Sequence, residues 1–77
     1  MFYRTRNLTL ASYLCTEGIR LDKIERSPGN QVTFVFQDPS LLAERYEKAL
    51  ADGTAEVNLH EYMTELNALR DVIFKGS

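Results

Sequence analysis

Cys15 and His60 are the only thiol and the only imidazole in the sequence. A catalytic thiol needs a base within hydrogen-bond reach, often a histidine, and a third group that orients this base. The apolar residues around Cys15 recur with helical spacing, so we expect this small side chain to lie in the core. His60 is expected on the outer side of a different helix. We therefore predict no thiol–imidazole catalysis.

No other residues have the spacing of a metal or phosphate site. Zinc sites need several cysteines or histidines at short, regular spacings, and the chain offers one of each. The four glycines fall at expected helix ends, in a turn and near the end of the sequence, so no glycine-rich phosphate loop is predicted. We expect no metal and no cofactor.

Acidic residues are abundant in the second half of the chain and fall mostly on the polar faces of expected helices: Glu44, Glu47, Asp52, Glu56, Glu61, Glu65 and Asp71. Nothing in their pattern marks a buried carboxylate pair of the kind used in acid–base catalysis. We interpret them as solvated surface, and we expect that the protein is not an enzyme.

Five basic residues near the N-terminus are the candidate contact residues for nucleic acid or a partner: Arg4, Arg6, Arg20, Lys23 and Arg26. Residues 1–30 carry a net charge of +2 and residues 31–77 carry −4. An extended segment with arginines can follow a phosphate backbone. However, three acids lie among these bases, and two solvated faces of opposite sign would explain the asymmetry without a ligand. Nucleic-acid binding is therefore the alternative hypothesis.

The length and composition predict one small soluble domain, residues 1–77. Of the 77 residues, 44% are hydrophobic and 26% are charged, and the net charge is −2. A chain of this length buries roughly 60% of the surface that it exposes when unfolded, so its core is thin. The last expected helix also carries apolar residues on more than one side. We therefore expect a homodimer.

One cysteine cannot form an internal disulfide, which fits a reducing compartment. The sequence shows no signal peptide, and no window approaches the roughly 20 apolar residues of a membrane span. We therefore expect a cytoplasmic protein that does not contact a membrane.

The N-terminal elements are an extended arm and a helix. Residues 2–6 alternate, with Arg4 and Arg6 on one side. Asn7 is a good N-cap for a helix over residues 8–17 because its side chain can accept a free amide of the first turn. Gly18 would end this helix, and Ile19 would fold back on its last turn.

A β-hairpin is predicted next. Residues 19–25 read as a strand with a bulge, since Ile24 breaks the alternation. Residues 27–30 form a turn in which Pro28 and Gly29 take the central positions of type II, with Asn30 as its last residue. Residues 31–37 alternate most clearly and form the second strand.

Two helices should follow the hairpin. Asp38 as N-cap and Pro39 at the first helical position predict a helix over residues 39–51, and residues 54–57 could be an edge strand. Asn58 would cap the last helix, with Glu61 completing a capping box, and residues 75 and 76 would end it. The fold class is α+β: a helix, an antiparallel β-hairpin, then two helices packed on a small sheet.

Aromatic residues occupy the faces that we assign to the core: Phe34, Phe36, Tyr46, Tyr62 and Phe74. A sheet that displays aromatic side chains could stack nucleic-acid bases. In a domain with so little core, however, Phe34 and Phe36 are needed inside, together with Val32 on the same face. We therefore favour the core interpretation.

The pattern resembles a small family of prokaryotic and phage-borne domains of unknown function. The resemblance rests on an opening Thr-x-Asp-Leu-x-Leu-Ala-x-Tyr-Leu before a glycine, then Phe-x-Phe-x-Asp, which fall here on Thr5, Asn7, Leu8, Leu10, Ala11, Tyr13, Leu14, Gly18, Phe34, Phe36 and Asp38. Asn7 stands where the family tends to have aspartate, and it keeps the capping role. The resemblance implies no catalytic residues and an association with phages and mobile elements.

We therefore expect a non-enzymatic protein-interaction or accessory module with an unidentified protein partner, derived from a phage or mobile element. The alternative is a small DNA- or RNA-binding accessory protein that uses the basic N-terminal face.

Overall fold

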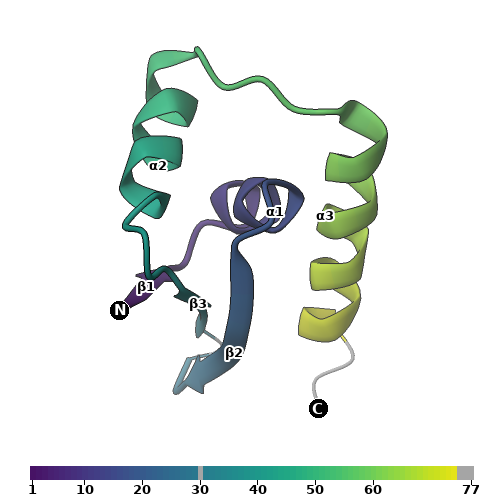
Figure 1. Ribbon diagram of the computed structural model, residues 1–77. Helices are drawn as coiled ribbons and strands as arrows, with labels where there is room; N and C mark the ends of the chain where they lie inside the picture. The colour runs from purple at the N-terminus through teal and green to yellow at the C-terminus, as the bar shows by residue number, and fades with distance from the viewer. Residues whose placement is uncertain (30, 75–77) are drawn as a thin grey trace.

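The computed structural model describes residues 1–29 and 31–74 (Figure 1). The elements along the chain are β1 (Phe2–Thr5), α1 (Leu8–Thr16), β2 (Arg20–Ser27), β3 (Gln31–Gln37), α2 (Ala43–Asp52) and α3 (Leu59–Phe74). One antiparallel sheet and three helices make a small α+β fold, as predicted.

The sheet has the strand order β1-β3-β2, so β3 is central and the hairpin β2–β3 is extended by the N-terminal strand. Tyr3 of β1 and Leu21 of β2 both lie opposite Phe36 of β3. The predicted extended conformation of residues 2–6 is confirmed over Phe2–Thr5, whereas the pairing of this segment with β3 was not predicted. Its alternation was visible in the sequence, but its pairing with a strand about 30 residues away was not.

The hairpin follows the prediction closely. The register of β2 shifts between Leu21 and Lys23, which places a bulge at Asp22, two residues before the Ile24 that breaks the sequence alternation. Gly29 has φ 84°, the left-handed conformation that the third position of a type II turn needs. Asn30, the last residue of the predicted turn, lies outside the described residues.

Both ends of α1 are closed as the sequence predicts. The Asn7 side chain accepts hydrogen bonds from the amides of Thr9 (2.9 Å) and Leu10 (3.3 Å). At the other end, Gly18 has φ 87°, and the amide of Ile19 donates to the carbonyl of Leu14 at 3.0 Å, as in a Schellman motif. These caps fix where the chain passes from β1 into α1 and from α1 into β2.

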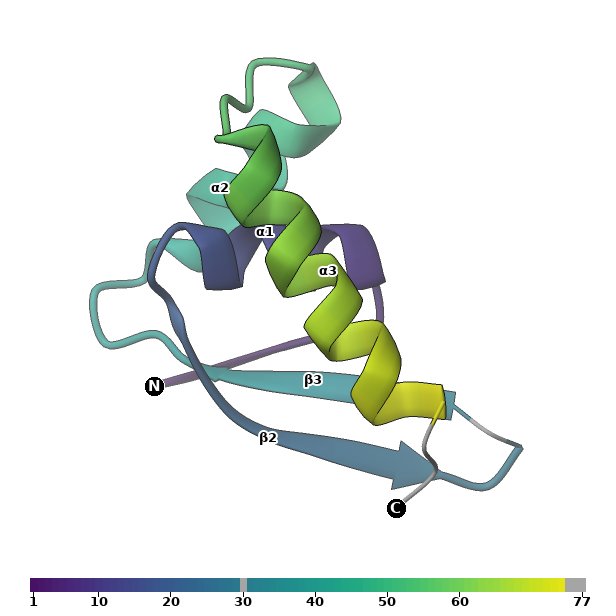
Figure 2. The ribbon, with the colours of Figure 1, turned by 90° about the vertical axis from the view of Figure 1, so that its right-hand side faces the viewer.

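Helix α1 lies over one face of the sheet, with α2 on one side of it and α3 on the other (Figures 1 and 2). The core joins this helix to the central strand, and its buried members are Leu10, Ala11, Tyr13, Leu14, Phe34, Phe36, Ala43 and Leu69. The core positions of Phe34 and Phe36 are thus confirmed. Phe74, in the last turn of α3, is 77% exposed, so its assignment to the core is wrong.

Helix α2 begins at Ala43, four residues later than predicted. Pro39 lies in a turn, and Leu41 has φ 55°, a left-handed conformation that interrupts any helix there. The N-cap position is Leu42, so the predicted N-cap Asp38 and the predicted start at Pro39 are both wrong. The Asp38 carboxylate nevertheless reaches across the loop to the helix start, where it accepts from the amides of Leu42 (2.8 Å) and Ala43 (3.2 Å).

The segment between α2 and α3 is not a strand, which corrects the prediction for residues 54–57. The amides of Thr54 (2.9 Å) and Ala55 (3.1 Å) donate to the carbonyl of Ala49 and so close the end of α2 instead. Asn58 then caps α3 by accepting from the amide of Glu61 at 3.0 Å, as predicted. The predicted end of this helix at residues 75 and 76 lies outside the described residues.

The longest described helix, α3, has sixteen residues. Within residues 1–29 and 31–74, no helix is both long enough and apolar enough to cross a bilayer.

Candidate functional site

In the part of the chain that the structure describes, no helix covers one face of the sheet, which we call the open face: Phe2, Arg4, Arg20, Lys23, Glu25, Thr33, Val35 and Gln37. Arg4 and Lys23 lie on either side of Val35 in the register. Val35 is nevertheless only 1% exposed. The aliphatic stems of its two basic neighbours explain this burial, since long charged side chains can cover apolar surface while their charged ends stay in water.

Charges on the open face largely compensate one another. Glu25 accepts from Nε of Arg4 at 3.4 Å and lies 3.5 Å from Nζ of Lys23. Asp22 accepts from the Gln37 side chain at 3.0 Å. Each basic side chain of this cluster is 56% exposed, so these ion pairs contribute little to stability. They do lower the positive potential that a phosphate backbone would meet.

The five predicted contact residues do not form one surface. Arg4, Arg20 and Lys23 lie on the open face, and Arg6 adjoins it in a shallow hollow shared with Thr33. Arg26 lies elsewhere. It pairs with Val32, on the helix-covered side, and its guanidinium donates to the carbonyls of Val72 (2.9 Å) and Ile73 (3.4 Å).

The position of Arg26 gives it a structural role. The last carbonyls of a helix have no partner within the helix, and a cationic side chain can satisfy them and favour the negative end of the helix dipole. Arg26 therefore joins the sheet to the end of α3. The sequence does not indicate this role, because Arg26 lies more than 40 positions from Val72 and Ile73.

Helix α3 has a second, outward apolar surface, which we call the α3 outer face: Leu59, Met63, Arg70 and Phe74. Leu59 is 72% exposed and Phe74 is 77% exposed, whereas Leu69 on the inner side is buried. The Arg70 guanidinium lies 5.9 Å from the centre of the Phe74 ring. These residues recur at intervals of four, seven and four, so they follow one side of the helix over its length of about 24 Å.

Cys15 and His60 line the same hollow between the end of α1 and the start of α3, together with Thr16, Glu61, Thr64 and Glu65. The sequence did not predict this proximity. Burial, with a further effect of the Glu65 charge, raises the pKa of the Cys15 thiol to about 11. At neutral pH the thiol is protonated and a poor nucleophile. Within the described residues, no group of three or more histidine, cysteine or acidic residues is placed to hold a metal ion.

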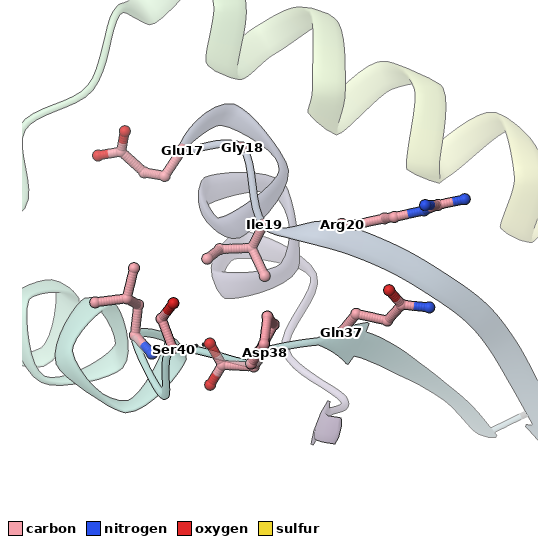
Figure 3. Close-up of a pocket in the computed structure, with 9 residues that line it drawn as sticks. Glu17, Gly18, Ile19, Arg20, Gln37, Asp38 and Ser40 are labelled. Atoms are coloured by element: carbon pink, nitrogen blue, oxygen red, sulfur yellow. Dashed lines mark hydrogen bonds between the residues drawn. The ribbon is translucent and has the colours of Figure 1, made fainter. Parts of the chain in front are cut away.

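A cleft of about 320 Å³ lies where the end of α1 and the start of β2 meet the loop between β3 and α2 (Figure 3). Figure 3 shows the Glu17 and Arg20 side chains extending in opposite directions from this cleft. The Asp38 carboxylate at its base already accepts two backbone amides. The cleft therefore lacks the convergent polar groups that a small-molecule site usually has.

Comparison with known proteins gives a family. The sequence matches a protein-family model described as a domain of unknown function, DUF5659, over residues 1–75. The chain belongs to this family. The DUF5659 match spans all six elements, which confirms the predicted resemblance to an uncharacterised small domain family. No curated protein and no solved structure matches the chain significantly.

Proposed function

We propose that this DUF5659 domain is a non-enzymatic interaction module of the cytoplasm that binds a partner protein through the α3 outer face. The observation that carries the proposal is the two-sided character of α3. Its inner side, with Leu69, packs against α1, while Leu59 and Phe74 remain exposed on another side of the same helix. The fold does not use this second surface.

The chemistry of the α3 outer face defines its partner. Exposed apolar side chains gathered on one side of a helix are a common feature of protein-binding surfaces. A helix that offers anchors at intervals of four and seven residues fits an apolar groove or another amphipathic helix. Arg70 is part of the α3 outer face, so the partner surface should be apolar with a carboxylate opposite the guanidinium. A family association with phages would fit a module that binds a host protein.

The remaining chemistry supports a non-enzymatic role. The Cys15 thiol beside His60 has a raised pKa, and the carboxylate of Asp38 is engaged by two backbone amides. Neither group offers the activated nucleophile or free general base that catalysis requires.

Affinity capture from a lysate of the native host, with and without nuclease, tests the class of partner. The tagged protein should retain proteins that remain bound after nuclease treatment, because apolar contacts do not depend on nucleic acid. Loss of every bound protein on nuclease treatment would contradict the proposal.

A second candidate function is nucleic-acid binding by the open face. The supporting observation is that Arg4, Arg20 and Lys23 project from one sheet face, which also bears the exposed ring of Phe2. A basic sheet with an aromatic side chain can bind single strands through phosphate contacts and base stacking. Pairing of Glu25 with two of these bases weakens this candidate.

The variant Arg4→Ser/Arg6→Ser/Arg20→Ser tests the second candidate. All three side chains are exposed, so the fold should persist. If the open face binds nucleic acid, anisotropy titrations should show weaker binding of every probe, and the slope of log affinity against log salt should fall by up to about three. If α3 provides the functional surface, neither parent nor variant should bind duplex or single-stranded probes at physiological salt.

A further inference from the structure

Among residues 1–29 and 31–74, strand β2 is an edge of the sheet with one side unpaired. The strand order places β2 beside β3 on one side only, and β2 has eight residues against four in the other edge strand, β1. Among the described residues, no backbone hydrogen bond joins the outer edge of β2 to another element. Figure 2 shows β2 along the lower border of the molecule, with no described element beyond it. Its outward backbone groups are therefore available to another strand.

We propose that β2 pairs with β2 of a second copy of this chain in an antiparallel arrangement centred on Ile24. This would make a continuous six-stranded sheet with a twofold axis perpendicular to it. It goes beyond the proposed function, because it uses the sheet edge and none of the residues of the α3 outer face.

The charge pattern of β2 selects this register. In a symmetric antiparallel pair, one residue must lie opposite its own copy, and residues equally distant from it lie opposite one another. With Ile24 at the centre, Lys23 faces Glu25 of the second copy, and Glu25 faces Lys23. Both side chains lie on the open face, so their charged ends can meet across the two strands. Opposite charges directly across two strands stabilise their pairing.

Every other symmetric register that pairs at least five residues of β2 brings like charges together. Centring on Asp22, Lys23 or Glu25 sets that charged residue against its own copy, and like charges in this position oppose pairing. Ile24 at the centre meets only Ile24. Its side chain lies on the helix-covered side of the sheet, opposite Phe34 and packed against the core cluster. The central contact is thus apolar and its flanks are complementary.

The exposed side chains of β2 are placed for this contact. Lys23 and Glu25 both lie on the open face, where their exposed ends are 3.5 Å apart within one protomer. In the dimer, the internal pair of each protomer would be exchanged for a pair across the interface, two in all. Scattered edge charges commonly prevent strand pairing, whereas a sequence that complements itself around one residue permits one register. Because a single strand pair buries little surface, the dimer should be weak, with dissociation in the micromolar range.

Charge reversal at the two flanking positions tests both the edge and the register. Sedimentation equilibrium should show a reversible dimer for the parent. Lys23→Glu alone and Glu25→Lys alone should each weaken dimerisation by about tenfold, because each places like charges opposite at two symmetric positions. The double variant Lys23→Glu/Glu25→Lys restores complementarity and should recover the dimer. Arg6→Glu serves as the control. It changes the net charge of the protein as much as Lys23→Glu does, but it lies outside β2 and should have little effect on dimerisation.

Three results would overturn the proposal. The first is a parent that remains monomeric at the highest soluble concentration. The second is a dimer that the single reversals leave intact. The third is a dimer that the double variant fails to recover while circular dichroism shows the variant folded. The variant Leu59→Glu/Met63→Glu locates the alternative interface: if it dissociates the dimer and the β2 reversals do not, the copies associate through the α3 outer face.

Discussion

Helices α1 and α3 differ in how the rest of the molecule surrounds them. Helix α1 has nine residues, and five consecutive ones, Leu10 to Leu14, are buried. Helix α3 has sixteen residues, and Leu69 is the only one that the structure buries fully among its described positions. The sheet lies under α1 and a helix lies on each side of it, whereas α3 meets the rest of the domain along one side (Figure 1).

The two helices therefore differ in role: α1 is packed into the core, whereas α3 has apolar surface that the core does not bury. Even Ser12 is buried in α1, where its hydroxyl donates to the carbonyl of Leu8 at 2.8 Å. A polar group can be buried in this way only when it has a hydrogen-bond partner. In α3, by contrast, large apolar residues face outward. We infer that α1 and the central strand provide most of the stability and that α3 provides the interaction surface.

Removing a ring from each region should give the largest difference. Phe34→Ala and Phe36→Ala should each lower the free energy of unfolding by about 3–5 kcal/mol, because both rings are buried beneath α1. Phe74→Ala removes the same group from an exposed site and should cost less than about 0.5 kcal/mol. Urea unfolding of the three variants measures this. Similar midpoints for all three would show that the two regions do not differ.

The alkylation rate of Cys15 tests how well the contact between α1 and α3 shields this thiol from solvent. Since the pKa of its thiol is raised from an ordinary 9.0 to about 11, the thiolate fraction at pH 8 should be about one hundredth of that of a free thiol. Alkylation by iodoacetamide should be slow at pH 8 and should accelerate as the pH approaches 11. The raised pKa means that the protonated form is favoured in the folded state. A rate that levels off by pH 9 would show that α3 does not shield this thiol.

The two asparagine caps should give a smaller contrast. Asn7→Ala and Asn58→Ala each remove a side-chain acceptor from the first turn of a helix, at a cost of about 1 kcal/mol. The loss at Asn7 should increase hydrogen exchange throughout the core, because α1 contacts every layer. The loss at Asn58 should increase exchange mainly in the first turn of α3. Equal, global increases from both changes would contradict this distinction.

Local signals predicted much of the fold. Asn7, Gly18 and Asn58 act through backbone groups a few residues away, so their types alone identified the helix ends. The alternation of β3 likewise identified Phe34 and Phe36 as core residues. These features depend on short stretches of chain, and the sequence displays them directly.

The features that were missed or predicted wrongly depend on contacts between distant segments or on a backbone conformation that the residue type does not suggest. The pairing of β1 with β3 joins the N-terminus to residues more than 30 positions away. The start of α2 depends on the left-handed Leu41, a conformation that a leucine rarely adopts and that its type does not suggest. The contact residues were predicted as one group, but the cap that Arg26 provides for α3 separates it from the others. The sequence did indicate that α3 is apolar on several sides, but not which side faces outward.

Affinity capture with a matched pair of α3 variants is the most direct test of the proposed function. Leu59→Glu/Met63→Glu places two carboxylates on the α3 outer face. His60→Glu/Thr64→Glu places two at the adjacent exposed positions, one residue further along the helix in each case, and serves as the control. Both proteins should fold, because none of the four side chains is buried.

We expect the parent and the control to retain the same nuclease-resistant partner proteins from the host lysate, and the outer-face variant to lose them. If the outer-face variant retains these proteins as well as the parent does, the α3 outer face is not the binding surface, and the central claim is wrong.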